Sequence, residues 1–276
     1  MLRDITLGQY YPKNSVVHRL DPRVKIFTTF VYLVLIFCVR DFVGYALVTC
    51  ALAVVTAVSR IPVKFMARGM RPILFILLFT FVINLITYDG TILLRLGPLS
   101  ITDTGVRQAV FIAVRLVLLI FGTSLLTYTT RPVALTDGLE AVMSPLTKIR
   151  VPAHEIAMMM SIALRFIPTL LNEADKTMKA QQARGADFES GNLLHRAKNM
   201  LPLFIPLFIN AFRMAVDLAM AMEARCYHGG KGRTRLHPMK FAGRDYAACA
   251  LTVLFAVLVV AHARGLLPIP QVWPVR

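Results

Sequence analysis

The sequence predicts an all-α polytopic membrane protein, with about five transmembrane helices and a cytoplasmic domain of about three helices. Hydrophobic residues make up 57% of the 276 residues, whereas soluble domains contain about 45–50%. These residues also form long runs almost free of charge, at 24–39, 42–58, 72–88, 108–128 and 246–263. A bilayer core about 30 Å thick is crossed by roughly 17–25 helical residues, so each run with its flanks is long enough.

Lysine and arginine are distributed unevenly between the two sides of these runs. Twenty-five lie before the first run, between the second and third runs, or in residues 129–244, and only five lie on the other side. Because cytoplasmic loops carry an excess of these residues, the N-terminus and residues 129–244 are predicted in the cytoplasm and the C-terminus outside. The formal charge of +16 then reflects topology, with some attraction to the anionic lipid of the bilayer. No nucleic-acid partner is expected.

Three regions follow from this topology: an N-terminal membrane block at 1–130, a cytoplasmic coupling-helix domain at 131–244, and a last span with an outer tail at 245–276. A segment as long as 131–244 needs structure of its own. Its pattern predicts two long helices, at 153–183 and about 193–225, and a shorter helix at about 133–143. The long helices are mostly apolar but too charged to cross the bilayer, so we expect them at its cytoplasmic face.

Both long helices carry candidate surfaces for a membrane partner. On the first helix, apolar residues recur at helical spacing: Ile167, Leu170, Leu171, Ala174 and Met178. On the second, small residues at every fourth position let another helix approach closely: Ala211, Ala215 and Ala219. Methionines at 158–160, 214, 220 and 222 are either core filler or an adaptable surface for several partners, and the sequence leaves both interpretations open.

Each long helix ends in an alanine, an arginine and a small residue: Ala183-Arg184-Gly185 and Ala224-Arg225-Cys226. In one interpretation the arginines complement the negative end of the helix dipole, which is worth about 0.3–1 kcal/mol each. In the other, each projects a rigid fork of donors that binds a carboxylate of a partner. The same tripeptide also occurs at 67–69 and 263–265, so the letters alone do not decide.

The sequence lacks the patterns of the common catalytic sites. It contains no G-x-x-x-x-G-K-[ST] phosphate loop, no H-E-x-x-H and no G-x-S-x-G, so we expect no enzyme, no cofactor and no metal site. The predicted spans contain no Asp or Glu, which argues against an ion-driven carrier. Arg115 lies inside a predicted span. It either marks a functional site or lies near the outer end of its helix and reaches the interface.

Three segments resemble the T component of energy-coupling factor (ECF) transporters, which are ABC-type importers, and the related transmembrane subunits of cobalt and biotin importers. These segments are GQYYPKNSVVHRLDPRVKI (8–26), ALRFIPTLLNEADKTMKAQQARGADF (163–188) and AMEARCYHGGKGRTRLHP (221–238). The resemblance covers essentially the whole chain. Ala-Arg-Cys at 224–226 departs from the usual Ala-Arg-Gly of the family.

The resemblance implies a function in the cell membrane of a prokaryote. A T component transmits the ATP-driven movement of two cytoplasmic ABC ATPases to a membrane-embedded S component, which binds a vitamin or other micronutrient. Arg184 and Arg225 would dock the ATPases, with Ala183, Gly185, Ala224 and Cys226 as small flanks, and the apolar and small residues of the long helices would face the S component. The alternatives are a T subunit dedicated to cobalt, nickel or biotin import and, further removed, a stand-alone carrier.

Overall fold

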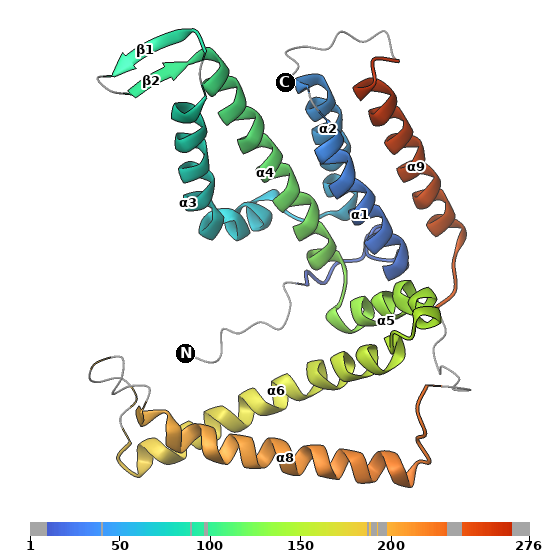
Figure 1. Cartoon of the computed structure of the whole chain (residues 1–276). Coiled ribbons are helices and arrows are strands. Elements are labelled where there is room, and N and C mark those ends of the chain that lie inside the picture. Colours follow the sequence, from blue (N-terminus) through green and yellow to red (C-terminus); the bar gives the residue numbers. More distant parts are fainter. Residues whose placement is uncertain are drawn as a thin grey trace. The chain divides into compact units, whose positions relative to one another are not determined.

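The chain is helical almost throughout the part that the structure describes (Figure 1). The computed structural model describes residues 10–39, 41–88, 90–96, 99–186, 188, 192, 198–230 and 239–266. Residues 8–138 and 239–276 form one compact unit and residues 139–238, with 1–7, form the other. The first unit holds α1 (Pro22–Cys38), α2 (Phe42–Ser59), α3 (Val63–Thr87), α4 (Asp103–Thr129) and α9 (Gly243–Ala263). The all-α prediction is confirmed.

The five helices of this unit lie at the five predicted spans, but α3, α4 and α9 begin earlier than predicted, at Val63, Asp103 and Gly243. Pro72 lies inside α3, and the helix bends by 65° between Val63–Met70 and Pro72–Thr87, as expected where a proline removes a backbone donor. By length and composition five of the described helices can cross a membrane, namely α2, α4, α6, α8 and α9, with the bent α3 as a sixth. That α6 and α8 nevertheless lie at the membrane face remains a prediction from their charges.

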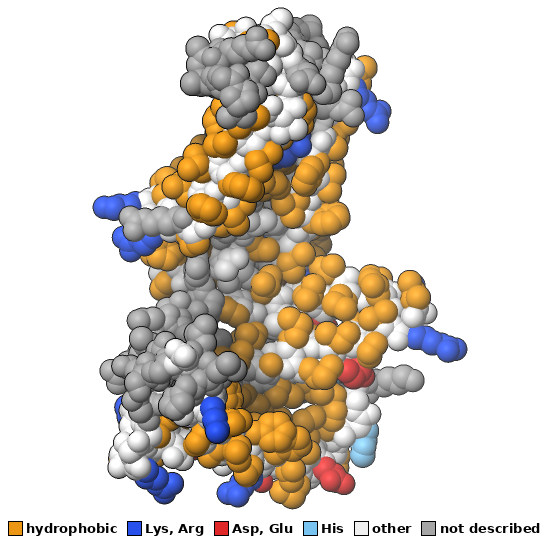
Figure 2. Space-filling view, turned by 60° about the vertical axis from the view of Figure 1, so that its left-hand side comes forward, with side chains coloured by type: hydrophobic (Ala, Val, Ile, Leu, Met, Phe, Trp, Pro, Cys, Tyr) orange, Lys and Arg blue, Asp and Glu red, His pale blue; other side chains and the backbone are white. Residues whose placement is uncertain are grey.

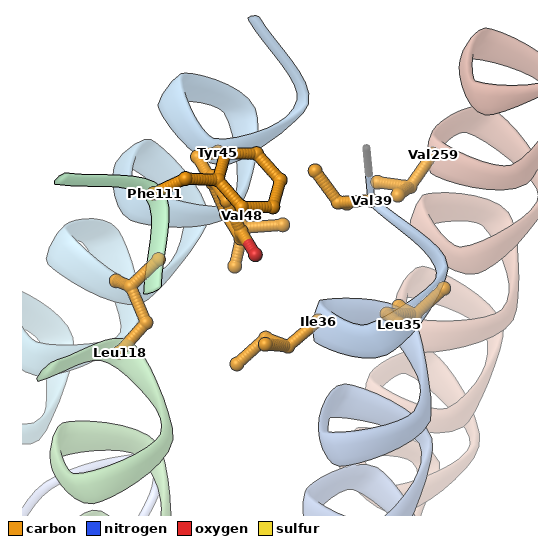
Figure 3. Close-up of a cluster of buried hydrophobic side chains, with 8 residues drawn as sticks. All are labelled: Leu35, Ile36, Val39, Tyr45, Val48, Phe111, Leu118 and Val259. Atoms are coloured by element: carbon orange, nitrogen blue, oxygen red, sulfur yellow. The ribbon is translucent and has the colours of Figure 1, made fainter. Parts of the chain in front are cut away.

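The core of the first unit joins α1, α2, α4 and α9 (Figure 3). Its buried side chains are Leu35, Ile36, Val39, Tyr45, Val48, Phe111, Leu118 and Val259. The Tyr45 and Phe111 rings lie 4.6 Å apart between centroids, a distance typical of favourable aromatic pairs. Gly122 lets α1 approach α4, because a Cβ at this position would overlap the ring of Tyr32, whose hydroxyl donates to the Leu118 carbonyl at 2.8 Å.

A short antiparallel hairpin of β1 (Ile92–Leu96) and β2 (Leu99–Thr102) connects α3 to α4. This hairpin was not predicted, because strands of four or five residues give a weak pattern beside the long helical runs around them. The Thr102 hydroxyl accepts from the Gly105 amide at 3.1 Å and donates to the Tyr88 carbonyl at 2.6 Å. One side chain thus caps the start of α4 and fixes the end of α3.

The second unit is built on two long helices, α6 (Ala153–Ala183) and α8 (Leu201–Ala224). They are preceded by α5 (Pro132–Met143), whose first residues belong to the other unit, and by the 3₁₀ helix η2 (Ser144–Ile149). α6 has the predicted bounds and α5 begins one residue earlier than predicted. α8 begins at Leu201, later than the predicted start near residue 193, and residues 193–197 lie outside the described part of the chain.

α6 and α8 pack against each other as an antiparallel pair (Figure 1). The Asn210 amide donates to Glu173 at 3.2 Å near the middle of the pair. Gly230, six residues beyond the end of α8, lies against the ring of His154 in the first turn of α6. The end of α8 is therefore near the start of α6.

Candidate functional site: the helix tips and the open face of α8

Arg184 is the C-cap residue of α6, where the helical hydrogen bonds end. The Ala186 amide donates to the Gln181 carbonyl and the Gly185 amide donates to the Gln182 carbonyl, each at 3.0 Å. Gly185 has a φ of +86°. This pair of bonds with a left-handed residue after the cap is the Schellman motif, which satisfies carbonyl groups that the helix leaves open.

Arg225 ends α8 in the same way. The Tyr227 amide donates to the Met222 carbonyl at 3.1 Å and the Cys226 amide donates to the Glu223 carbonyl at 2.8 Å. Cys226 occupies the left-handed position with a φ of +54°, which costs about 1–2 kcal/mol for a residue with a Cβ. The small residue of each pattern is thus the left-handed residue of the cap.

A third copy of this cap ends α9, at Ala263-Arg264-Gly265. Gly265 has a φ of +71°, and Leu266 and Gly265 donate to the carbonyls of Ala261 and His262. The remaining Ala-Arg-Gly, at 67–69, lies inside α3. The letters Ala-Arg-Gly are therefore compatible with a helix end and with a helix interior, and they do not by themselves mark a special site.

The cap bonds are made by the backbone, so the side chains of Arg184 and Arg225 remain available. Both side chains are exposed, and neither forms a hydrogen bond or ion pair within the described part of the chain. A guanidinium offers five N–H donors in a planar fork. Ala183, Gly185, Ala224 and Cys226 are small and exposed as well, so none of these four neighbours covers either arginine.

The antiparallel packing places the two arginines at opposite ends of the pair. Each arginine follows the last residue of its helix, and the two helices run in opposite directions (Figure 1). With a rise of 1.5 Å per residue the 24 residues of α8 alone extend about 36 Å. The two arginines are therefore separated by a distance of this order.

The predicted partner-facing residues divide into two groups. Leu170, Leu171, Ala174 and Met178 on α6 and Ala211 on α8 are half-buried, whereas Ile167, Ala215 and Ala219 are exposed. On α8 the buried or half-buried positions include Leu203, Leu207, Met214 and Leu218. They lie on the side of Asn210, which binds Glu173 of α6. Burial against the other long helix therefore accounts for part of the predicted surface.

The other side of α8 is an exposed apolar surface, here called the open face. Seven large side chains on it are between 51% and 66% exposed, and they recur at helical spacing: Phe204, Ile205, Phe208, Ile209, Phe212, Val216 and Met220. Hydrophobic side chains also cover much of the surface visible in Figure 2. This face was not predicted from the sequence, where only the alanines of α8 were singled out, although its phenylalanines recur four residues apart.

Arg115 lies within the bundle of the first unit, between α1, α2 and α4. Its Nε donates to the hydroxyl of Tyr45 at 2.7 Å. Its guanidinium lies over the rings of Phe111 and Phe37, at 5.1 and 5.7 Å from their centroids. These contacts stabilise the charge through aromatic faces and attach Arg115 to neighbouring helices. Within the described residues no group of three His, Cys, Asp or Glu side chains could hold a metal ion.

Comparison with known proteins agrees with this architecture. A family model described as CbiQ, cobalt transport protein, matches residues 13–236. The protein named energy-coupling factor transporter transmembrane protein EcfT from Thermosediminibacter oceani is 55% identical over 93% of this chain and 97% of its own length. The chain belongs to this family. EcfT proteins of Ruminiclostridium cellulolyticum and Bacillus subtilis are 53% and 44% identical, each over 94% of this chain and 97% and 98% of their own lengths.

The chain is accordingly a transmembrane component of an ECF transporter. Its relatives are named as transmembrane proteins of that transporter, and several of its helices are long and apolar enough to lie in a membrane. The names of these relatives describe a transport subunit and not an enzyme. The ECF family membership covers both units, since the family model extends from residue 13 to residue 236.

Proposed function

We propose that this ECF transmembrane component couples two cytoplasmic ATPases to a membrane S component that binds a vitamin or another micronutrient. The observation that carries the proposal is the pair Arg184 and Arg225, exposed in the same cap geometry at opposite ends of α6 and α8. Two equivalent tips match two equivalent ATPase subunits. The N-terminus and the second unit lie on the cytoplasmic side in this proposal, and the C-terminus lies outside.

Each arginine docks in a groove of one ATPase that presents acidic side chains. The planar fork binds a carboxylate through two parallel hydrogen bonds, which are stronger and more directional than a single ionic contact. The exposed alanine and the left-handed residue on either side leave space for the groove to enclose the guanidinium. When ATP binding and release change the separation of the ATPases, the tips move with them and shift α6 and α8.

The open face of α8 is the contact for the S component in this proposal. Large apolar side chains in contact with water are costly, at about 25 cal/mol for each Å² of apolar surface, and a contiguous apolar patch marks an interaction surface. The exposed residues predicted from sequence, Ile167, Ala215 and Ala219, extend the contact around the helices. Substrate recognition then resides on the S component, so the chain itself needs no substrate site.

The double substitution Arg184→Ala with Arg225→Ala tests the proposal. The transporter is produced by co-expression with its ATPases and S component, purified and reconstituted into liposomes. We expect co-purification of the ATPases and substrate uptake to be lost, since truncating one member of a buried charge pair costs about 2–5 kcal/mol. The protein itself should still insert, because the cap bonds of both helices are made by the backbone.

Arg264→Ala is the matched control for this experiment. Arg264 is exposed and ends α9 with the same cap, but it lies on the predicted outer side, away from the ATPases. Uptake in this variant should equal that of the unmodified protein. Full uptake and normal ATPase recovery in the double variant would overturn the docking role. Substrate movement by the purified chain in liposomes without ATPases would instead support a stand-alone carrier.

A further inference from the structure

The coupling helices are joined to the first unit by two connections, and the structured segments next to both connections contact the first turns of α1. The chain leaves the first unit after Gly138 and returns at Met239. The end of α4, the first part of α5 and the start of α9 are the structured parts of the first unit nearest to these connections. All three contact the sequence DPRVKI at 21–26, here called the junction segment.

Lys25 of the junction segment holds the end of α4. Its side chain is buried, with 7% of the residue exposed, and Nζ donates to the carbonyl of Thr129 at 2.9 Å and to that of His18 at 3.1 Å. Thr129 is the last residue of α4, and its carbonyl has no donor within the helix. The ammonium group therefore supplies the hydrogen-bond donor that this carbonyl lacks within the helix.

Asp21 and Asp245 hold the start of α9 on the start of α1. Asp245 is 2% exposed, and its two oxygens accept from the Asp21 amide at 2.9 Å and from the Ala242 amide at 2.8 Å. The two aspartates are also the attractive charges for Lys25, which a buried ammonium requires. Just before α9, the ring of Phe241 lies 5.5 Å from the guanidinium of Arg23.

Gly138 brings α5 against the same segment. A Cβ at this position would lie 2.8 Å from Cβ of Pro22 and 3.2 Å from Cδ1 of Ile26. The first distance is shorter than real side chains allow, so the helix could not stay in place with any larger residue. The junction segment therefore contacts the last structured element before the chain leaves the unit and the first one after it returns.

We propose that the junction segment anchors both connections of the coupling helices to the membrane bundle, with Lys25 as the positioning residue. This inference rests on the proposed coupling function. A movement of the coupling helices can move the membrane bundle only if the backbone that connects the two keeps its position on the bundle. With the anchor intact, movement of α6 and α8 is passed to α1, α4 and α9. Without it, the connections stretch and the ATPases continue to hydrolyse ATP with little transport.

Lys25→Met tests the anchor, with Asp41→Asn as the matched control. The carboxylate of Asp41 lies 2.7 Å from Nε2 of His262, within hydrogen-bond distance. Both residues are buried. His262 is near the C-terminal end of α9, whereas Asp245 is near its start. The control thus removes the charge of a buried polar pair that involves α9 without touching either connection.

Both variants are assembled with the ATPases and S component, and substrate uptake and ATP hydrolysis are measured in the same liposomes. In Lys25→Met we expect uptake per ATP to fall by at least about five-fold, within the range of typical coupling energies. In Asp41→Asn the ratio should remain within about two-fold of the unmodified protein. An unchanged ratio in Lys25→Met, or an equal fall in both variants, would overturn the proposal.

Gly138→Ala provides a second test of the anchor if the Lys25→Met protein does not assemble with the ATPases and S component. It displaces α5 from Pro22 by the bulk of one methyl group, and the same fall in uptake per ATP is expected. Hydrogen exchange of the assembled complex gives a readout independent of transport. The amides at 129–131 and 242–246 should exchange faster in Lys25→Met than in Asp41→Asn, and equal exchange would refute the anchor. Failure of the coupling function itself appears separately, as normal uptake in the Arg184 and Arg225 double variant.

Discussion

Arg184 and Arg225 occupy the same position of the same helix-ending motif, at opposite ends of an antiparallel helix pair. Each is the C-cap residue, each is followed by a left-handed residue, and each has an exposed side chain. The equivalence is one of backbone geometry and not only of sequence letters. It presents two guanidinium groups on rigid helix ends, separated by about the length of α8.

Replacing Arg184 or Arg225 by lysine should weaken ATPase binding without abolishing it. Lysine keeps the charge but loses the planar fork, and with it one of two charge-assisted hydrogen bonds worth about 1.5 kcal/mol, or about ten-fold in affinity. Titration of purified ATPase against the reconstituted protein measures the change. Because the tips are far apart, the two single effects should multiply in the double variant. A lysine variant that binds as tightly as the arginine form would show that charge alone is recognised.

Cys226→Gly should stabilise the end of α8. The residue has a φ of +54°, and glycine adopts this conformation without the cost that a Cβ imposes, so we expect a gain of about 0.5–1 kcal/mol. Gly185→Ala is the reciprocal change, because a Cβ there would meet no atom within 4 Å, so that only backbone strain acts. Thermal unfolding in detergent should therefore shift upwards for the first variant and downwards for the second. Shifts in the same direction would contradict the cap argument.

Phe208→Asn together with Phe212→Asn should release the S component. The two rings lie 4.8 Å apart between centroids on the open face, where they are 66% and 59% exposed, so their replacement removes little packing within the chain besides this ring contact. Central aromatic contacts in protein interfaces often cost 2 kcal/mol or more when truncated, or about thirty-fold in affinity. Co-purification of the S component measures the loss. Recovery of the ATPases is the internal control and should not change.

Acidification should destabilise the segment before α1 through His18. Burial lowers the pKa of His18 from 6.5, and the nearby Lys25 lowers it further, while the hydrogen bond with the Tyr11 carbonyl raises the pKa. The unfolded chain then binds a proton more readily than the folded one, so stability falls as the pH drops below about 6.5 and is unaffected by this residue above it. Ser15 and the Tyr10 ring complete the surroundings of the imidazole.

His18→Gln is the variant that checks this dependence. The melting temperature of the purified protein is measured between about pH 7.5 and pH 5.5. The melting temperature should fall further over this interval in the unmodified protein than in the variant, since glutamine does not titrate. Equal slopes in the two proteins would show that other groups carry the acid sensitivity.

The sequence by itself determined the helical membrane fold, the positions of most helices and the two arginines. Long uncharged runs have few alternatives to helices in a bilayer, because every backbone polar group needs a partner there. The bounds of α6 follow in the same way, since its apolar face repeats with the helical period and Gly185 ends it. These are local signals, and each is contained within a few turns of chain.

The tertiary structure alone decided which residues far apart in sequence come together. The antiparallel packing of α6 and α8 separates the arginine tips, buries part of the predicted partner surface and leaves the open face of α8 exposed. In the other unit, Lys25 contacts Thr129, and Asp21 contacts Asp245 across 224 positions of sequence. No periodicity encodes such contacts, because they depend on how whole helices pack and on which helix ends must find hydrogen-bond partners.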